Sequence, residues 1–84
     1  MTTRKTDKAI VTTIEAGNNF IILVITQDLI EAYKEIGEIM EKNFSYRIID
    51  ISAQAIQLTS AIVPSGAPGL AITCICELKP RSTI

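Results

Sequence analysis

The chain has 84 residues, of which 48% are apolar and 20% charged, and its formal net charge is −1. This length allows one domain, the apolar content excludes an intrinsically disordered chain, and the small net charge excludes the strongly basic field that non-specific duplex binding needs. Sixteen residues are isoleucine, and the mean hydropathy of +0.33 is more apolar than a lone domain of this size readily buries. We therefore expect a homo-oligomer.

The residue types that are missing also limit the function. The chain contains no histidine and no tryptophan, so the commonest general base and the commonest zinc ligand are absent. We expect no enzymatic activity, no metal and no cofactor. The longest apolar run, residues 20–25, is far shorter than the roughly 20 residues that cross a bilayer. Residues 1–8 contain no hydrophobic signal region, so we expect a cytoplasmic protein without a membrane partner.

The N-terminal part of the chain predicts two strands. Residues 1–7 are polar and are predicted to be frayed and disordered. Residues 9–16 alternate, with Ile10, Thr12 and Ile14 on one face. Gly17 and the two following asparagines tolerate a positive φ and predict a hairpin turn. Residues 20–25 have no polar face, which is typical of a strand covered on both sides.

A helix is predicted next, ending near residue 43. Asp28 is the expected N-cap, with Thr26 as the alternative. Gly37 costs about 1 kcal/mol relative to alanine in a helix, so we expect it to permit a close backbone approach. The apolar arc is about 180° wide at 100° per residue, and its centre consists of Leu29, Tyr33, Ile36, Met40 and Phe44.

The remaining chain predicts two strands around one long loop. Residues 46–58 alternate and then change phase, which predicts a bulge near Ala55. Residues 59–69 contain two prolines and two glycines within six residues, and continue neither regular element. Cys74 and Cys76 share a face of the last strand, where we expect two small buried apolar side chains. The inward-facing residues of residues 70–79 are Leu70, Ile72, Cys74, Cys76 and Leu78.

Together these elements predict an α+β fold in one domain that spans residues 1–84, with a core at 8–79 and a tail at 80–84. The order is strand, strand, helix, strand, strand, which predicts a four-stranded mixed sheet with the helix as a right-handed crossover between parallel strands. The position of the last strand within the sheet stays open. One helix covers one face, so we expect the second face to be buried in an oligomer.

The topology indicates where a ligand could bind. The strands ending at Ile25 and Leu58 are predicted to run parallel, so the loop and the helix N-terminus share one end of the sheet. Helix N-termini and glycine-rich backbone offer N–H groups to anions. The alternatives are that the loop is only a connection and that Asp28 repels an anion. The candidate ligand-binding residues at this end are Thr26, Gln27, Ser65, Gly66, Gly69 and Lys8.

A second group of candidate ligand-binding residues lies at the opposite end. Arg47, Lys79 and Arg81 are predicted to gather near the first hairpin turn, where arginines could hold a phosphate or carboxylate. The alternative is that these charges only solubilise strand ends, with Arg47 paired to Asp50 or Glu77.

The segment Ile48-Ile49-Asp50-Ile51, after an amphipathic helix and before a last alternating strand, resembles small sporulation-associated proteins. The layout is also similar to phage proteins that sequester a cyclic nucleotide signal of bacterial defence. The resemblance spans residues 20–79 and transfers no ligand residue. It implies a non-enzymatic, oligomeric small protein that acts as a ligand sponge.

The sequence therefore favours an oligomeric binding protein that captures a small anionic ligand, such as a signalling nucleotide, at a subunit interface. One alternative is a protein–protein interaction or structural module without a small-molecule ligand. A second is a weak nucleic-acid binder that uses N-terminal and strand-end basic residues, against which the acidic pI of 5.3 counts.

Overall fold

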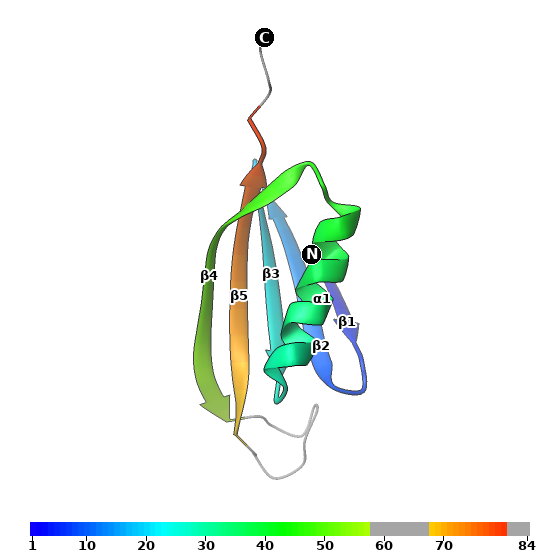
Figure 1. Cartoon of the computed structure of the whole chain (residues 1–84), viewed down its shortest axis with the longest axis vertical. Helices are drawn as coiled ribbons and strands as arrows, with labels where there is room; N and C mark the ends of the chain where they lie inside the picture. Colours follow the sequence, from blue (N-terminus) through cyan, green and yellow to red (C-terminus); the bar gives the residue numbers. More distant parts are fainter. Residues whose placement is uncertain (58–67, 81–84) are drawn as a thin grey trace.

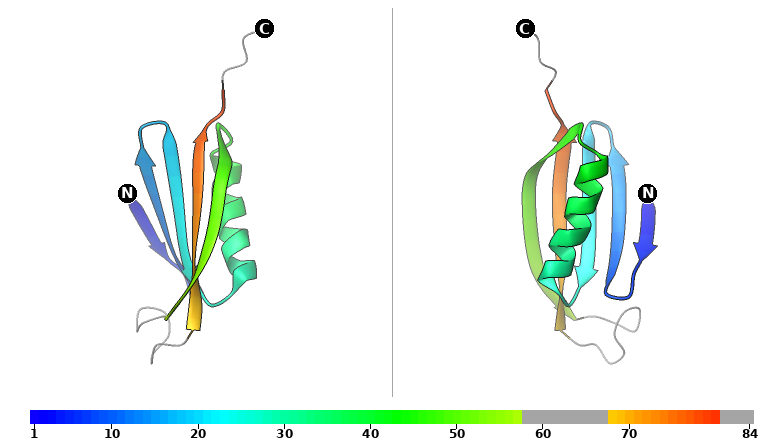
Figure 2. Two further views of the ribbon diagram at one scale, coloured as in Figure 1. Left: turned by 90° about the vertical axis from the view of Figure 1, so that its left-hand side faces the viewer. Right: turned by 45° about the vertical axis from the view of Figure 1, so that its right-hand side comes forward.

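The structure, a computed structural model, describes residues 1–57 and 68–80, and in these residues it contains five strands and one helix. The strands form one antiparallel sheet in the order β1-β2-β3-β5-β4, and the helix lies on one face of it (Figures 1 and 2). The elements are β1 (Thr2–Lys5), β2 (Ala9–Ala16), β3 (Asn19–Thr26), α1 (Leu29–Lys42), β4 (Tyr46–Gln57) and β5 (Pro68–Leu78).

The sheet is antiparallel throughout, so the predicted four-stranded mixed sheet is wrong. β5 lies between β3 and β4 and pairs antiparallel with both. β3 and β4 do run in the same direction, as expected, but α1 connects them across the intervening β5. This order gives β3 a hydrogen-bonded neighbour at each edge, whereas the described helix covers only one of its two faces.

The additional strand is β1, in the segment that the sequence predicts to be frayed. Its residues pair with β2, from Thr2 opposite Thr13 to Lys5 opposite Ile10. A tight connection joins the two strands, in which the Thr6 backbone N–H donates to the carbonyl of Ala9 at 2.8 Å. Threonine suits a strand because its branched Cβ restricts χ1.

The predicted hairpin turn and helix cap are both confirmed. Gly17 adopts a φ of +62° in the turn between β2 and β3, a conformation that glycine adopts without strain. The Asp28 side chain accepts a hydrogen bond from the Ile30 backbone N–H at 2.9 Å. This bond satisfies one of the backbone donors that a helix start leaves without a partner. Asn43 ends the helix as its C-cap.

The helix is rotated relative to the predicted arc. Ala32 and Ile36 are buried against the sheet, whereas Tyr33 is 56% and Phe44 75% exposed. Glu35 is also buried on this side of the helix, where it pairs with Arg4 of β1. Gly37 is exposed, and a Cβ there would have no neighbour within 4 Å. The predicted close approach at Gly37 is therefore wrong.

The core lies between α1 and the sheet face that it covers. The buried residues of β5 are Ile72, Cys74 and Cys76, which confirms the burial of both cysteines, whereas Leu78, also predicted to face inward, is 42% exposed. Phe20 and Tyr46 stack with ring centroids 5.3 Å apart. The buried apolar residues are Ala9, Val11, Phe20, Ile22, Val24, Ala32, Ile36, Ile72, Cys74 and Cys76.

A bulge in β4 sets which of its residues face the helix. Ile48 pairs with Cys76 and Asp50 with Ile75, so Ile49 is the extra residue. The bulge predicted near Ala55 is therefore wrong. After Ile49 the strand is regular. Residues opposite each other in an antiparallel pair share a face, so Ile51, Ala53 and Ala55 lie on the helix side and Asp50, Ser52 and Gln54 on the other.

The second face of the sheet has an apolar centre, which we call the bare face. Figure 2 shows the helix on one side of the sheet only, and none of the described elements lies over the other side. Polar residues surround the centre, namely Thr3 and Lys5 on β1 and Asp50, Ser52 and Gln54 on β4. The centre consists of half-buried Ile10, Ile14, Ile21, Leu23, Ile25, Ala71 and Ile75, together with half-buried Thr12 and Thr73 on either side of Leu23.

Candidate functional site

The structure brings four of the predicted ligand-binding residues to one end of the sheet. Thr26 is buried, and its Oγ1 donates to the Lys8 carbonyl at 2.7 Å and accepts from the Asp28 N–H at 3.1 Å. The Gln27 Nε2 donates to the Pro68 carbonyl at 3.4 Å, beside Gly69. The end of β3, the start of α1 and the start of β5 therefore meet here, as predicted. Ser65 and Gly66 lie outside the described residues.

This end of the sheet offers little attraction to an anion. The Asp28 carboxylate already occupies the first turn of α1, where it accepts from the Ile30 N–H. A carboxylate in this position satisfies the positive end of the helix dipole and repels a second anion. The Thr26 hydroxyl is also used, since it makes two hydrogen bonds within the fold. The remaining group that could attract an anion at this end is the ammonium of the exposed Lys8.

The opposite end of the sheet holds Arg47 and Lys79, but Arg47 is neutralised. Its Nε and Nη2 donate to the same Glu77 oxygen at 3.1 and 2.7 Å. Of the two predicted partners of Arg47, Glu77 is therefore confirmed and Asp50 is not its ion-pair partner. Lys79 is exposed, and its backbone N–H donates to the backbone carbonyl of Ser45 at 2.8 Å. Arg81 lies outside the described residues.

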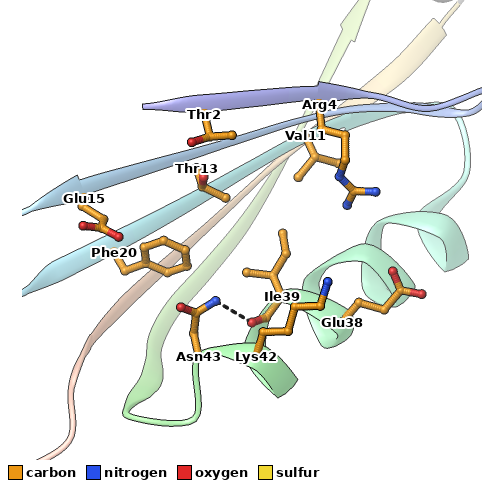
Figure 3. A pocket seen from close by; sticks show the side chains of 10 residues that line it. All are labelled: Thr2, Arg4, Val11, Thr13, Glu15, Phe20, Glu38, Ile39, Lys42 and Asn43. Atoms are coloured by element: carbon orange, nitrogen blue, oxygen red, sulfur yellow. Dashed lines mark hydrogen bonds between the residues drawn. The ribbon is translucent and has the colours of Figure 1, made fainter.

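A hollow of about 410 Å³ lies elsewhere, between α1 and strands β1 and β2 (Figure 3). Its apolar lining is Val11, Phe20 and Ile39. The sequence interpretation missed this hollow because one wall is β1, which was predicted to be frayed. The only available signal was the run of β-branched threonines at residues 2 and 3. The polar lining residues are Thr2, Arg4, Thr13, Glu15, Glu38, Lys42 and Asn43.

The charges around this hollow are mixed. The Arg4 Nη2 donates to Glu35 at 2.5 Å, and the Glu35 side chain is only 5% exposed. Glu15 and Glu38 bring negative charge and Lys42 brings positive charge. The Asn43 side chain donates to the Ile39 carbonyl at 2.8 Å, which closes the helix end (Figure 3). The hollow therefore combines an apolar floor with both signs of charge and does not select an anion.

The two cysteines lie beneath the helix and their thiols are protonated at neutral pH. Their Sγ atoms are 3.9 Å apart, and the Cys76 thiol donates to the Met40 sulfur at 3.6 Å. Burial, followed by the neighbouring Cys76, raises the pKa of Cys74 to about 12. Burial also raises the pKa of Cys76. A protonated buried thiol is neither a nucleophile nor a metal ligand, so the cysteines act as core side chains.

Residues 1–57 and 68–80 contain no group of three or more histidine, cysteine, aspartate or glutamate side chains placed to hold a metal ion. The single helix in this part of the chain is neither long enough nor apolar enough to cross a membrane.

Comparison with known proteins adds no relative. No protein-family model, no curated protein and no solved structure matches the chain. The resemblance to sporulation-associated proteins and phage nucleotide sponges therefore stays a hypothesis.

Proposed function

We propose that this chain is a non-enzymatic, homo-oligomeric binding protein that assembles through its bare face. The observation that carries this proposal is the apolar centre on β2, β3 and β5, which none of the described elements covers. Five isoleucines and one leucine on one flat surface exceed the scattered apolar exposure of ordinary monomers. A second copy related by a two-fold axis would present the same apolar centre in return.

The size and composition of the bare face support a specific interface. A strand of eight residues is about 27 Å long and five strands span about 24 Å, so one face measures roughly 650 Å². Pairing two copies would bury roughly 1,300 Å², which exceeds the roughly 1,000 Å² expected of a specific interface. An apolar centre with a polar rim is also the usual anatomy of such interfaces.

The ligand part of the proposal is a small anion, such as a signalling nucleotide, held where two copies meet. Its support is the convergence of Lys8, Thr26, Gln27 and Gly69 at one end of the sheet. Lys5 lies on the bare face at the same end, because it is opposite Ile10. In a dimer formed by the bare face, Lys5 and Lys8 of each copy would flank this end, which would offset the charge of Asp28.

Native mass spectrometry of the purified protein tests both parts. We expect a dimer or a multiple of it for the wild type. Leu23→Lys, which places a charge at the centre of the bare face, should lower the mass by at least half. Tyr33→Lys is the matched control, because Tyr33 is exposed on the helix away from this face, and it should leave the mass unchanged.

The same spectra report the ligand. With added 3′,5′-cyclic AMP we expect one bound nucleotide per interface, and less of it in Lys8→Glu. A monomeric wild type, or a mass that does not respond to Leu23→Lys, contradicts assembly through the bare face. A clear assembly that takes up no nucleotide supports the alternative, an interaction module without a small-molecule ligand.

A further inference from the structure

β4 is an edge strand whose two faces are both exposed. It is the longest strand of the sheet, at 12 residues, and all of them except Tyr46 and Ile56 are exposed. Ile48 and Ile51 are each 44% exposed and Ile49 is 49% exposed. The helix packs chiefly over β3, with further contacts to β2 and β5, so it leaves β4 uncovered. Among the described elements, the sheet therefore ends in a long, exposed strand that has β5 on one side only (Figure 1).

The two edges of the sheet differ in how they are protected against pairing. Natural proteins protect edge strands by keeping them short, by charging them with lysine, or by interrupting them with proline or a bulge. β1 has four residues, and two of them are Arg4 and Lys5. In β4 the bulge lies at Ile49, near the start, and Asp50 is the only charge between Asp50 and Gln57. Eight regular residues without lysine, arginine, proline or glycine stay open to another strand.

We propose that β4 is a second self-association surface, where two copies pair their β4 strands antiparallel across a two-fold axis perpendicular to the sheet. This axis keeps both helices on the same side, so helix-side residues have to pair with helix-side residues. Two seven-residue pairings of segment 50–57 meet this condition, centred on Ala53 or on Gln54, and the one that includes Asp50 places Ala53 opposite its own symmetry mate. Ile51 then faces Ala55, and Asp50 faces Ile56.

The charges of β4 agree with self-pairing. In this register no charged residue of the segment after the bulge faces a like charge, because Asp50 lies opposite an isoleucine. The same operation on β1 would bring Arg4 and Lys5 close to their own copies, and like charges placed opposite each other are destabilising. Self-pairing is therefore compatible with the charges of β4, which supports a second copy as the occupant of this edge.

Pairing through β4 together with assembly through the bare face would determine the number of copies. This conclusion rests on the bare-face interface proposed above. The bare-face axis lies parallel to the sheet plane and the β4 axis is perpendicular to it. Two perpendicular two-fold axes that intersect generate a closed tetramer. We therefore expect four times the mass of one 9.2 kDa chain, in the form of two extended sheets packed face to face.

Charge variants at Ala53 test the β4 contact separately from the bare face. Ala53 is exposed and lies on the helix side, so a charged residue there does not alter the bare face. Ala53→Lys and Ala53→Glu should each halve the wild-type mass in light scattering, because like charges meet at the two-fold axis. Mixing the two variants should restore the wild-type mass, since opposite charges then face each other. Far-UV circular dichroism verifies that each variant is folded.

Comparing Leu23→Lys with Ala53→Lys shows which of the two proposed interfaces is present. If both exist, Leu23→Lys and Ala53→Lys each give dimers, and the double variant gives a monomer. If Leu23→Lys gives a monomer while Ala53→Lys leaves the mass unchanged, the β4 proposal is overturned and the bare face stands. The opposite pattern overturns the bare face and supports β4. A mass that is unchanged by Ala53→Lys, with an extended segment of another protein bound along β4, also overturns self-pairing.

Discussion

Glu35 is a buried carboxylate with a single ion-pair partner among the described residues, Arg4. Its side chain is 5% exposed, and its partner Arg4 reaches it from the short edge strand β1 with a half-exposed side chain. A buried carboxylate without a partner is strongly unfavourable. The pair therefore ties β1 to α1, and Arg4 also lines the hollow beside α1.

Removing Arg4 should cost much more stability than removing the exposed arginine Arg47. We expect Arg4→Met to lower the free energy of unfolding by about 2 kcal/mol, reduced from the 3–5 kcal/mol of a fully buried pair because Arg4 is half exposed. Arg47→Met, the matched control at the Arg47–Glu77 pair, should cost less than about 1 kcal/mol. Urea denaturation measures both. Equal costs would show that Glu35 does not need its partner.

The raised pKa of Cys74 makes the stability depend on alkaline pH. The thiol has a pKa of 9.0 in the unfolded chain and about 12 in the fold, so both states are protonated below pH 9. Above pH 9 the unfolded state loses the proton first and is stabilised. The free energy of unfolding should therefore fall between pH 9 and 12, by up to about 1.4 kcal/mol per pH unit for this thiol.

Cys74→Ala isolates this contribution from other groups that titrate in the same range. The variant loses packing at all pH values, so its stability curve starts lower, but it should fall less steeply above pH 9. Urea denaturation at pH 8, 9, 10 and 11 gives the two slopes. Parallel curves for wild type and variant would contradict a buried, protonated Cys74.

The helix and the β2–β3 hairpin each contain a glycine. Replacing the two glycines by alanine should change the stability of the fold in opposite directions. Gly37 lies within α1, where a Cβ has no neighbour within 4 Å, so Gly37→Ala should stabilise the fold by about 0.5–1 kcal/mol. Gly17 has a φ of +62°, so Gly17→Ala should destabilise by about 1 kcal/mol. Thermal unfolding of both variants shows whether each substitution raises or lowers the melting temperature relative to the wild type. A loss of stability in Gly37→Ala would mean that another copy packs on this side of the helix.

The elements also show what local sequence determines. Asp28 and the apolar spacing were sufficient to place α1, and the alternation of residues 9–16 and 70–79 gave the faces of β2 and β5. β1 was missed because its four residues bury nothing, and it is held by pairing with β2 and by the Arg4–Glu35 contact. The predicted orientation of α1 was wrong because burial of Ala32 and Glu35 depends on contacts with distant segments, the Arg4–Glu35 pair among them. Periodicity within one element contains no information about such a contact.

At the scale of the whole molecule, the order of the strands was the part that the sequence left open. The alternation of apolar residues in β5 determines which of its residues face the core. The same pattern fits a β5 at the edge of the sheet beside β4 and a β5 between β3 and β4, so it does not determine the strand order. The candidate ligand end was predictable to the extent that β3 and β4 run in the same direction, which brought Lys8, Thr26, Gln27 and Gly69 together. The hollow was not predictable, because it needs β1 and the true orientation of α1.

The central position of β5 has a consequence for how the protein folds during synthesis. The ribosome makes β5 after every other described element, yet this strand joins β3 to β4, and without it β4 has no neighbouring strand. Phe20 pairs with Cys76, so the decisive contacts join distant parts of the chain. Folds with such contacts form slowly, because a long loop has to close first. A nascent chain that ends before β5 therefore carries the apolar residues of β3 and β4 unpaired, and the sheet can be completed only after β5 has left the ribosome.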